Sequence, residues 1–137
     1  MKSNFKAMVL SCIDPRFQPI VYKYLKKKKL IGKYSAFTIA GSAIGATANK
    51  FSKWHKVFWD NFDTSVKLHN INKLIVINHR DCGAAKIING KKVFSKINEL
   101  KVHKNSFKKI KKIFKKKYPK LRIELKIISL NSEVETF

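Results

Sequence analysis

The chain alternates between short apolar runs and longer stretches in which apolar residues recur at helical spacing. The clearest run is Leu-Ile-Val-Ile at residues 74–77, which is typical of a parallel strand buried on both faces. Residues 7–11 form a second short apolar run, and residues 121–130 alternate as a strand does. We predict strands at residues 7–11, 34–39, 74–77 and 121–130.

Helical patterns separate these strands. Residues 57–69 carry Phe58, Phe62, Val66 and His69 at helical intervals. Residues 17–29 begin after a proline and end in a lysine cluster, where cations suit the helix dipole. A helix is expected to start at residues 84–88, whereas residues 43–55 give no clear prediction. Residues 94–117 predict a long basic helix, and its apolar face consists of Ile97, Leu100, Phe107, Ile110, Ile113 and Phe114.

Strands that alternate with helices predict an α/β fold, with a mainly parallel sheet of four to five strands flanked by helices. The chain has 137 residues and no linker rich in proline or glycine, so we expect one domain over residues 1–137. Ligands of parallel sheets bind beyond the carboxyl ends of the strands. Cys12 follows the first predicted strand, and His79 and Cys82 follow the third, so all three are expected at that edge.

The charge of the chain is unusual. There are 31 Lys and Arg residues against 8 Asp and Glu, which gives a net charge of +23. Such a field attracts anions, including nucleic acid and acidic proteins. The abundance of Lys, Ile, Asn and Phe is also typical of an AT-rich genome, so a nucleic-acid or acidic partner is the less favoured interpretation. No run of 18 apolar residues occurs, so we expect no membrane partner and a cytoplasmic protein.

The two cysteines of the chain, Cys12 and Cys82, lie 70 residues apart. In a reducing cytoplasm a disulfide between them is a poor default. His79 and Cys82 can reach one ion from a tight turn, and Cys12 would complete a Cys₂His set. Zinc accepts these ligands, and three protein ligands leave a fourth position for water, as catalytic zinc sites do. We therefore predict Zn²⁺ as the cofactor. The other histidines, His55, His69 and His103, lack metal-like spacing and are expected at surface or half-buried positions.

Two charged residues follow Cys12 at intervals of two. In an extended chain Asp14 and Arg16 lie on the same side as Cys12, because side chains alternate with period two. Asp14 can accept a hydrogen bond from a water on the metal and orient its lone pair. Arg16 can hold Asp14 away from the metal through a bidentate pair. We predict that Asp14 and Arg16 are the catalytic residues.

These motifs resemble those of the beta-class carbonic anhydrases. Residues 11–17, Ser-Cys-Ile-Asp-Pro-Arg-Phe, match the family's Cys-x-Asp-x-Arg motif. Ala40-Gly41-Ser42 is similar to its Ala-Gly-Asn loop, and residues 79–83, His-Arg-Asp-Cys-Gly, match its His-x-x-Cys-Gly motif. The resemblance covers nearly the whole chain. The sequence departs from the family at two positions. Ser42 replaces the asparagine of the Ala-Gly-Asn loop, and Thr38 stands where the family usually has arginine. Both departures concern the substrate pocket rather than the metal ligands.

The resemblance implies a small member of this family that interconverts CO₂ and bicarbonate through a zinc-bound hydroxide. A carbonic anhydrase is itself the standard example of a zinc ion that lowers the pKa of its water to about 7, although that example has three histidine ligands. The resemblance also implies a homodimer or a dimer of dimers with active sites at the subunit interface. We expect Gly41, Ser42 and Gly83 to lie beside the substrate.

Two other functions stay open at this point. The same scaffold resembles enzymes that hydrolyse carbonyl sulfide or carbon disulfide, which are other small heterocumulenes. The second alternative is a non-catalytic basic binding protein on the same fold. The lysine run at residues 108–117 is the best evidence for that alternative, but its apolar positions suit packing on the sheet.

Overall fold

The computed structural model describes residues 4–90 and 92–137. Its sheet has the strand order β2-β1-β3-β4-β5, in which β1 pairs in parallel with β2 and β3, β3 pairs in parallel with β4, and β5 runs antiparallel to β4. The strands are β1 (Ala7–Ser11), β2 (Tyr34–Thr38), β3 (Lys73–His79), β4 (Arg122–Ile128) and β5 (Val134–Thr136). This arrangement confirms the predicted α/β fold with a mainly parallel sheet.

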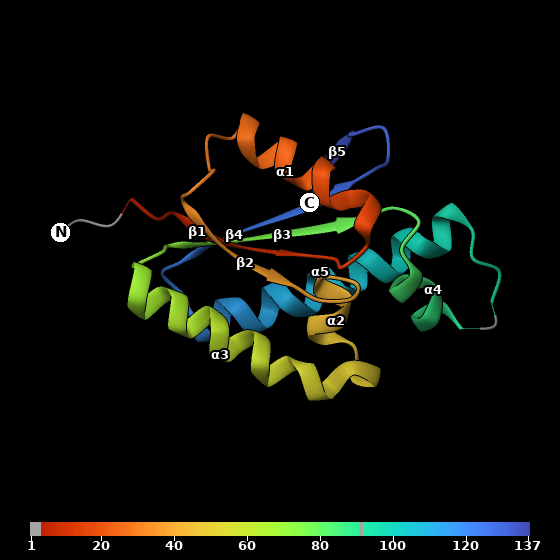
Figure 1. Cartoon of the computed structure of the whole chain (residues 1–137). Coiled ribbons are helices and arrows are strands. Elements are labelled where there is room, and N and C mark those ends of the chain that lie inside the picture. Colours follow the sequence, from red (N-terminus) through yellow and green to blue (C-terminus); the bar gives the residue numbers. More distant parts are fainter. Residues whose placement is uncertain (1–3, 91) are drawn as a thin grey trace.

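Helices cover both faces of the sheet. Figure 1 shows α1 on one face, and α2, α3 and α5 on the other. The helices are α1 (Gln18–Lys27), α2 (Ala43–Thr47), α3 (Ser52–His69), α4 (Gly83–Asn89) and α5 (Lys96–Lys117), with 3₁₀ turns η1 (Pro15–Phe17) and η2 (Asn49–Phe51). None of the helices in the described part of the chain is both long enough and apolar enough to cross a membrane.

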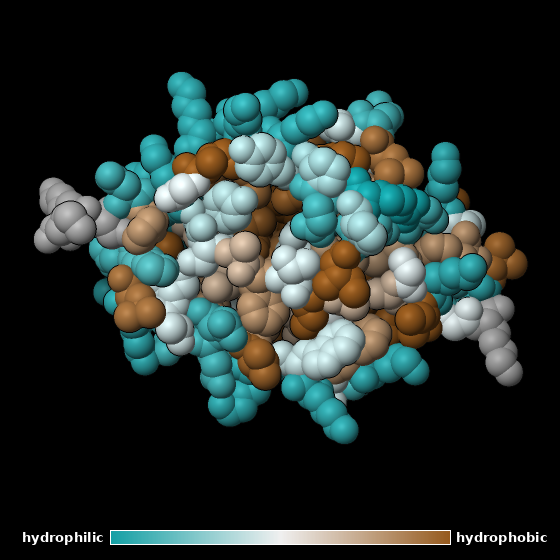
Figure 2. Space-filling model, viewed as in Figure 1, coloured by the Kyte–Doolittle hydropathy of each residue, from teal (hydrophilic) through white to brown (hydrophobic). Residues whose placement is uncertain are grey.

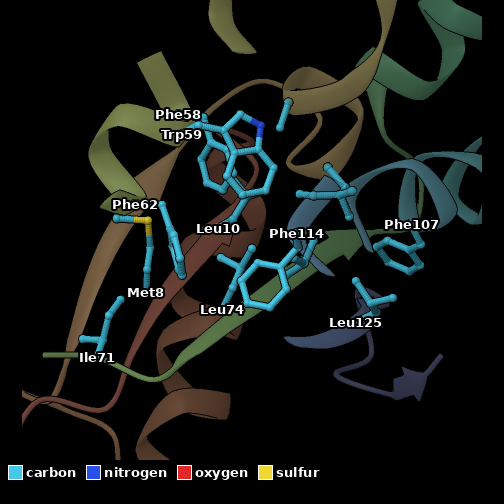
Figure 3. Packing of buried hydrophobic residues seen from close by; sticks show 14 of the residues in the cluster. Met8, Leu10, Phe58, Trp59, Phe62, Ile71, Leu74, Phe107, Phe114 and Leu125 are labelled. Atoms are coloured by element: carbon cyan, nitrogen blue, oxygen red, sulfur yellow. The ribbon is translucent and has the colours of Figure 1, made fainter. Parts of the chain in front are cut away.

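Alternating strand residues supply the two halves of the core. Met8 and Leu10 of β1 pack toward α3 and α5, where Phe62 and Phe114 are fully buried (Figure 3). The intervening residues of β1 pack on α1 in a second cluster. Because strand side chains alternate between faces, a strand buried on both sides needs apolar residues at successive positions, as residues 7–10 of β1 and 74–77 of β3 show.

The register of the strands sets the position of the functional edge. Ser11 at the end of β1 pairs with Ile77 of β3, two residues before the end of that strand. Cys12 therefore leaves the sheet beside His79, at the carboxyl ends of two neighbouring strands. This placement confirms the prediction that the two motifs meet at one edge.

Several predicted boundaries were wrong. The last helix begins at Lys96 rather than at residue 94, because the Ser95 side chain caps it by accepting a hydrogen bond from the Asn98 N–H at 3.1 Å. Ile97 lies in the first turn and is 68% exposed, so it is not part of the packed face. The strand predicted to reach residue 130 ends at Ile128, and the short β5 that follows was not predicted.

Candidate metal centre

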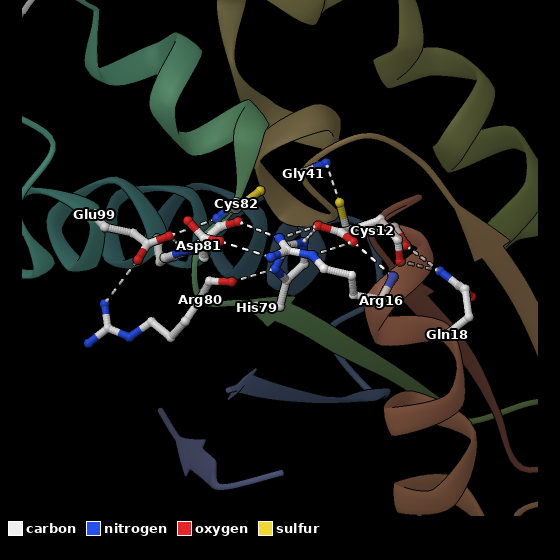
Figure 4. Close-up of polar contacts among 11 residues, drawn as sticks. Cys12, Arg16, Gln18, Gly41, His79, Arg80, Asp81, Cys82 and Glu99 are labelled. Carbon is white, nitrogen blue, oxygen red and sulfur yellow. Dashed lines mark hydrogen bonds and ion pairs between the residues drawn. The ribbon is translucent and has the colours of Figure 1, made fainter. Parts of the chain in front are cut away.

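The donor atoms of Cys12, His79 and Cys82 form one buried cluster. The two sulfur atoms and a histidine ring nitrogen all lie within 4.8 Å of one another. The three residues are 7%, 2% and 1% exposed. Cys12 follows β1, His79 ends β3, and Cys82 is the residue that precedes α4. Three residues from two segments of the chain are thus brought together (Figure 4).

The orientation of the His79 ring suits a metal ligand. Its Nδ1 lies 2.7 Å from the Arg80 carbonyl oxygen, which can only accept, so Nδ1 carries a proton and donates. The Nε2 atom is buried and has no hydrogen-bond partner among the described residues. Metal-bound histidines commonly donate their second nitrogen in this way. Burial lowers the pKa of His79, but the neighbouring Cys12 sulfur, the Arg80 carbonyl and the Asp14 carboxylate outweigh it and raise the pKa overall, so the site favours positive charge.

The contact between the two cysteines shifts the pKa values of their thiols in opposite directions. A hydrogen bond from Cys82 lowers the pKa of Cys12 to about 4, although burial opposes this change. The same interaction, together with burial, raises the pKa of Cys82. The Gly41 N–H also donates to the Cys12 sulfur at 3.2 Å. Two sulfurs and an unpartnered nitrogen that face one another fit a cation such as zinc, whose charge stabilises both thiolates.

An apolar shell surrounds the sulfur atoms. Cys12 and Cys82 belong to a buried cluster with Ile44, Ala84 and Ala85. Partly buried apolar residues pack against this cluster, namely Phe51, Ile88, Phe94 and Val102. An apolar environment weakens the competition from water and strengthens electrostatic interactions within the site.

Asp14 and Arg16 form a bidentate ion pair beside the cluster. Arg16 donates from Nε to Asp14 Oδ1 at 3.1 Å and from an NH2 nitrogen to Oδ2 at 2.8 Å. Asp14 Oδ2 lies 3.8 Å from the free His79 Nε2. The hydrogen bond from Arg16 lowers the pKa of Asp14 to about 2, so this carboxylate is ionised and can only accept hydrogen bonds at neutral pH.

The expected geometry of this pair was wrong in one respect. The chain is not extended from Cys12 to Arg16, because Pro15–Phe17 forms a 3₁₀ turn. Asp14 begins that turn and accepts a hydrogen bond from the Arg16 N–H at 2.9 Å. The turn, rather than strand alternation, therefore brings the two side chains together.

Arg16 also reaches Asp81, a residue that the sequence did not single out. Its Nη1 atom donates to Asp81 Oδ2 at 2.9 Å, and its Nη2 atom donates to the Asp81 carbonyl oxygen at 3.1 Å. Asp81 has a left-handed backbone with φ of 57°. Arg16 thus ties the loop after β1 to the loop after β3. The sequence feature that could have identified Asp81 is its position directly before Cys82.

The loop that contains Gly41 packs tightly against α4. Gly41 has φ of 79°, and a Cβ atom there would lie 2.7 Å from the Cβ of Ala84. Only glycine fits this conformation and contact without strain. Ser42 is fully buried, and its hydroxyl donates to the Leu10 carbonyl at 3.2 Å. Gly83, the first residue of α4, has open space at its Cβ position. That Gly41, Ser42 and Gly83 lie beside a substrate stays a prediction.

Two further polar residues, both on α5, lie close to Cys82 or to its contact residue. Glu99 is 5% exposed, and its Oε2 accepts a hydrogen bond from the Cys82 N–H at 2.9 Å. Burial raises the pKa of Glu99, but the neighbouring His103 ring and the backbone N–H groups of Cys82 and Asp81 outweigh it and lower the pKa. His103 was expected at the surface or half buried, and this was wrong because it is 0% exposed. The Glu-x-x-x-His spacing on one helix could have suggested the pair.

Comparisons with known proteins assign the chain to a family. A sequence model for the family described as "Putative carbonic anhydrase" matches residues 1–136, and the chain therefore belongs to that family. Uncharacterized proteins of Rickettsia bellii and Rickettsia conorii are each 28% identical to it over 129 residues, which is 93% of this chain and 79% and 69% of those proteins.

Solved beta-carbonic anhydrases share the fold. The enzyme CcaA aligns over 98% of this chain and 80% of its own, with a TM-score of 0.63 and 15% identity. A tetrameric beta-carbonic anhydrase of Sordaria macrospora aligns over 98% and 81%, with a TM-score of 0.61 and 8% identity. The enzyme CafA of Aspergillus fumigatus aligns over 98% and 76%, with a TM-score of 0.59 and 12% identity. The chain therefore has a beta-carbonic anhydrase fold.

Proposed function

We propose that this protein is a zinc-dependent enzyme that interconverts CO₂ and bicarbonate. The observation that carries the proposal is the buried cluster of Cys12, His79 and Cys82, in which His79 Nε2 lacks a hydrogen-bond partner within the described residues. Membership of the carbonic anhydrase family supports the same reaction. Cys12 Sγ, His79 Nε2 and Cys82 Sγ would hold the ion. Zinc at this position would supply Lewis acidity, which lowers the pKa of a bound water toward neutrality.

Asp14 and Arg16 are the proposed catalytic pair. The ionised Asp14 carboxylate faces the cluster and can accept a proton-bearing hydrogen bond from a water molecule there, which orients the attacking lone pair. Arg16 engages both carboxylate oxygens and so keeps Asp14 from moving the 3.8 Å toward His79 Nε2. The pair thus sets whether the carboxylate orients water or crowds the donor atoms.

The surroundings of the cluster favour a small apolar substrate. CO₂ has no net charge or dipole, and the shell around the sulfurs contains Ile44, Ala84 and Phe51. We propose that Gly41, Ser42 and Gly83 lie beside the substrate at the same edge. The net charge of +23 would draw the bicarbonate anion toward the protein surface.

We further propose that the protein is a homodimer formed through β2. This strand is an edge of the sheet within the described residues, and residues 34–49 contain no charged residue. Exposed edges are normally protected by charged side chains, above all lysine. Figure 2 shows weakly polar and apolar surface over β2 and α2, framed by hydrophilic surface. Phe37, Ile39, Trp54 and Val57 line a hollow of about 230 Å³ there.

Light scattering tests this assembly. Two chains carry +46, so the dimer should strengthen between low and moderate salt as repulsion is screened. Val57, which is 53% exposed, offers the sharpest variant. Val57→Lys should give monomers, whereas Leu68→Lys at a residue that is 72% exposed should remain dimeric. A parent that stays monomeric at every salt concentration would remove the β2 interface.

Stopped-flow CO₂ hydration tests the function itself. Zinc-loaded protein should hydrate CO₂, chelator-stripped protein should not, and added zinc should restore the rate. Carbonyl sulfide and carbon disulfide, tested on the same samples, separate the alternative substrates. No hydration by protein that holds one zinc per chain would rule out the proposed reaction.

A further inference from the structure

A buried chain of hydrogen bonds runs from α2 to α5, and its direction is fixed at one end. The backbone N–H of Ala43 can only donate, and it donates to Asn78 Oδ1 at 3.1 Å. The other side-chain atom of Asn78 is therefore its amide nitrogen, which lies 2.9 Å from His103 Nδ1. It also lies 3.3 Å from the Ser106 hydroxyl, which itself donates to the His103 carbonyl at 2.7 Å. Every one of these groups is buried.

This direction assigns the proton on the His103 ring. Because Asn78 donates to Nδ1, that nitrogen must accept, and the proton of the ring is on Nε2. His103 Nε2 forms no hydrogen bond with the described residues, and it lies 3.5 Å from Glu99 Oε2 in an ion-pair contact. The same carboxylate oxygen accepts the hydrogen bond from the Cys82 N–H at 2.9 Å. The chain of contacts therefore ends on the backbone of a candidate metal ligand.

Both sulfur-bearing loops are tied to this network. Ala43 lies two residues after Gly41, whose N–H donates to the Cys12 sulfur at 3.2 Å. Cys82 is held directly by Glu99. An ionised carboxylate is rarely buried without donors beside it, and here the Cys82 N–H donates to Glu99 while His103 Nε2 lies 3.5 Å away. In Figure 4 Glu99 lies beside Cys82 and Asp81, on the side away from Cys12.

We propose that Glu99 is a positioning residue that lies against His103, whose ring Asn78 orients, and that fixes the backbone of Cys82 so that its sulfur meets Cys12 and His79 around one metal ion. The inference rests on the proposed zinc site. Outer-shell partners of this kind typically change metal affinity by about 10- to 100-fold when they are replaced.

Two substitutions at Glu99 separate positioning from packing. Glu99→Leu fills similar space but removes the acceptor for the Cys82 N–H. Glu99→Gln keeps an oxygen that can take the place of Oε2. In competition with a chromophoric chelator, Glu99→Leu should bind zinc about 10- to 100-fold more weakly than the parent. Glu99→Gln should retain affinity within about threefold. With Co²⁺ as a spectroscopic probe, Glu99→Leu should show weaker thiolate-to-cobalt charge-transfer absorption, which a loss of stability alone would not produce.

Two control variants complete the test. Glu124→Gln neutralises a carboxylate that pairs with Lys73 at 2.7 Å at the start of β3, far along the strand from His79, and should leave zinc affinity unchanged. Ser106→Ala removes the 3.3 Å contact with Asn78 and the 2.7 Å hydrogen bond to the His103 carbonyl, but it leaves the Asn78–His103 and Glu99–Cys82 contacts and should change affinity less than twofold. Zinc affinity of Glu99→Leu within twofold of the parent would overturn the inference, and so would equal losses in Glu99→Leu and Glu99→Gln.

A third substitution keeps the test decisive if Glu99→Leu does not fold. His103→Leu has a side chain of similar volume but no ring nitrogen, so Glu99 would lose the contact at 3.5 Å that it makes with α5. Zinc affinity should fall several-fold, and an unchanged affinity would contradict the positioning role. Hydration is measured on the same samples. A parent that binds zinc without hydrating CO₂ fails the proposed function but not this inference.

Discussion

The two loops that carry the cysteines are supported in opposite ways. The loop after Cys12 depends on Asp14, Arg16 and Asp81, whose side chains are 16%, 46% and 70% exposed. The loop that contains Cys82 depends on Glu99 and His103, whose side chains are 7% and 0% exposed. One loop is therefore held by an ion-pair network open to water, and the other by polar groups inside the protein.

This difference separates two tasks. Exposed ion pairs contribute about 0–1 kcal/mol each, so their geometry can change during a reaction. A buried donor that loses its partner costs about 1–3 kcal/mol, so the Cys82 loop is fixed more firmly. We therefore expect substitutions near Arg16 to affect hydration with zinc retained, and substitutions near Glu99 to affect zinc affinity first.

The largest expected effect of the exposed loop is that of Arg16→Ala. Without Arg16, Asp14 is free to approach His79 Nε2 from 3.8 Å. Hydration should fall by about 100-fold or more while zinc content is unchanged, which corresponds to about 2.7 kcal/mol of barrier. Arg122→Ala, at an exposed position on β4, is the matched control and should be fully active. Activity of Arg16→Ala within about threefold of the parent would count against the dyad.

Asp81→Asn should have a smaller effect on the same rate. Arg16 would lose one charged partner at 2.9 Å but would keep both bonds to Asp14 and the bond to the Asp81 carbonyl. Because the Asp81 side chain is 70% exposed, its ion pair is screened by water. Hydration should fall less than about tenfold, with zinc retained. A loss as large as that of Arg16→Ala would mean that the two loops are not supported differently.

The pH dependence of stability gives a third test. The folded-state pKa of Asp14 is about 2, below its ordinary value of 3.8, because of Arg16. A depressed carboxylate stabilises the fold above its unfolded pKa, and this stability is lost as the pH falls through the folded value. In metal-free protein, denaturant unfolding should give a larger free energy of unfolding for the parent than for Asp14→Asn. This difference should be constant above about pH 5 and shrink from pH 3.8 toward 2. A difference in the free energy of unfolding that does not change with pH would contradict a stabilising Asp14–Arg16 ion pair.

The lysine-rich surface should have the smallest effect. On α5, residues 108–117 include seven lysines, and the helix packs on the sheet through Phe107, Ile110 and Phe114. If this surface reflects only the amino-acid composition of the chain, DNA binding should not depend on the DNA sequence. The logarithm of the binding constant should fall with the logarithm of the salt concentration, with a slope of about −0.9 per neutralised phosphate. Hydration should be unchanged by DNA. A nucleic acid or acidic protein retained at ~0.15 M salt and released by charge reversal at residues 108–117 would favour the binding function.

Local pattern was sufficient for most of the fold. The first strand has the predicted bounds, Ala7–Ser11, because its residues are all apolar or small and are buried. The antiparallel Val134–Thr136 was missed because its side chains are all exposed, so no alternation marks it. Residues 43–55 gave no clear prediction because the residues of α2 are all buried, whereas those of η2 and the start of α3 are mostly exposed, so no single periodic pattern runs through the segment. That residues 1–137 form a single domain stays a prediction.

The placement of the candidate site residues was predictable where a short motif at a strand end contained them. Cys12, His79 and Cys82 come together as expected, and so does the Asp14–Arg16 pair. Glu99 and His103 were missed because they belong to a different element from the residues they support. Glu99 lies 17 residues from Cys82, and His103 lies 25 residues from Asn78. No local pattern reports such contacts, which depend on how α5 docks on the sheet.

Zinc content is the most direct measurement of the central claim. Elemental analysis of the purified parent should give about one zinc per chain, and Cys12→Ser, Cys82→Ser and His79→Ala should each give almost none. His69→Ala, which replaces a histidine at the end of α3, is the matched control and should retain the parent's zinc. Zinc content that is unchanged in Cys12→Ser, Cys82→Ser or His79→Ala would contradict the proposed metal centre.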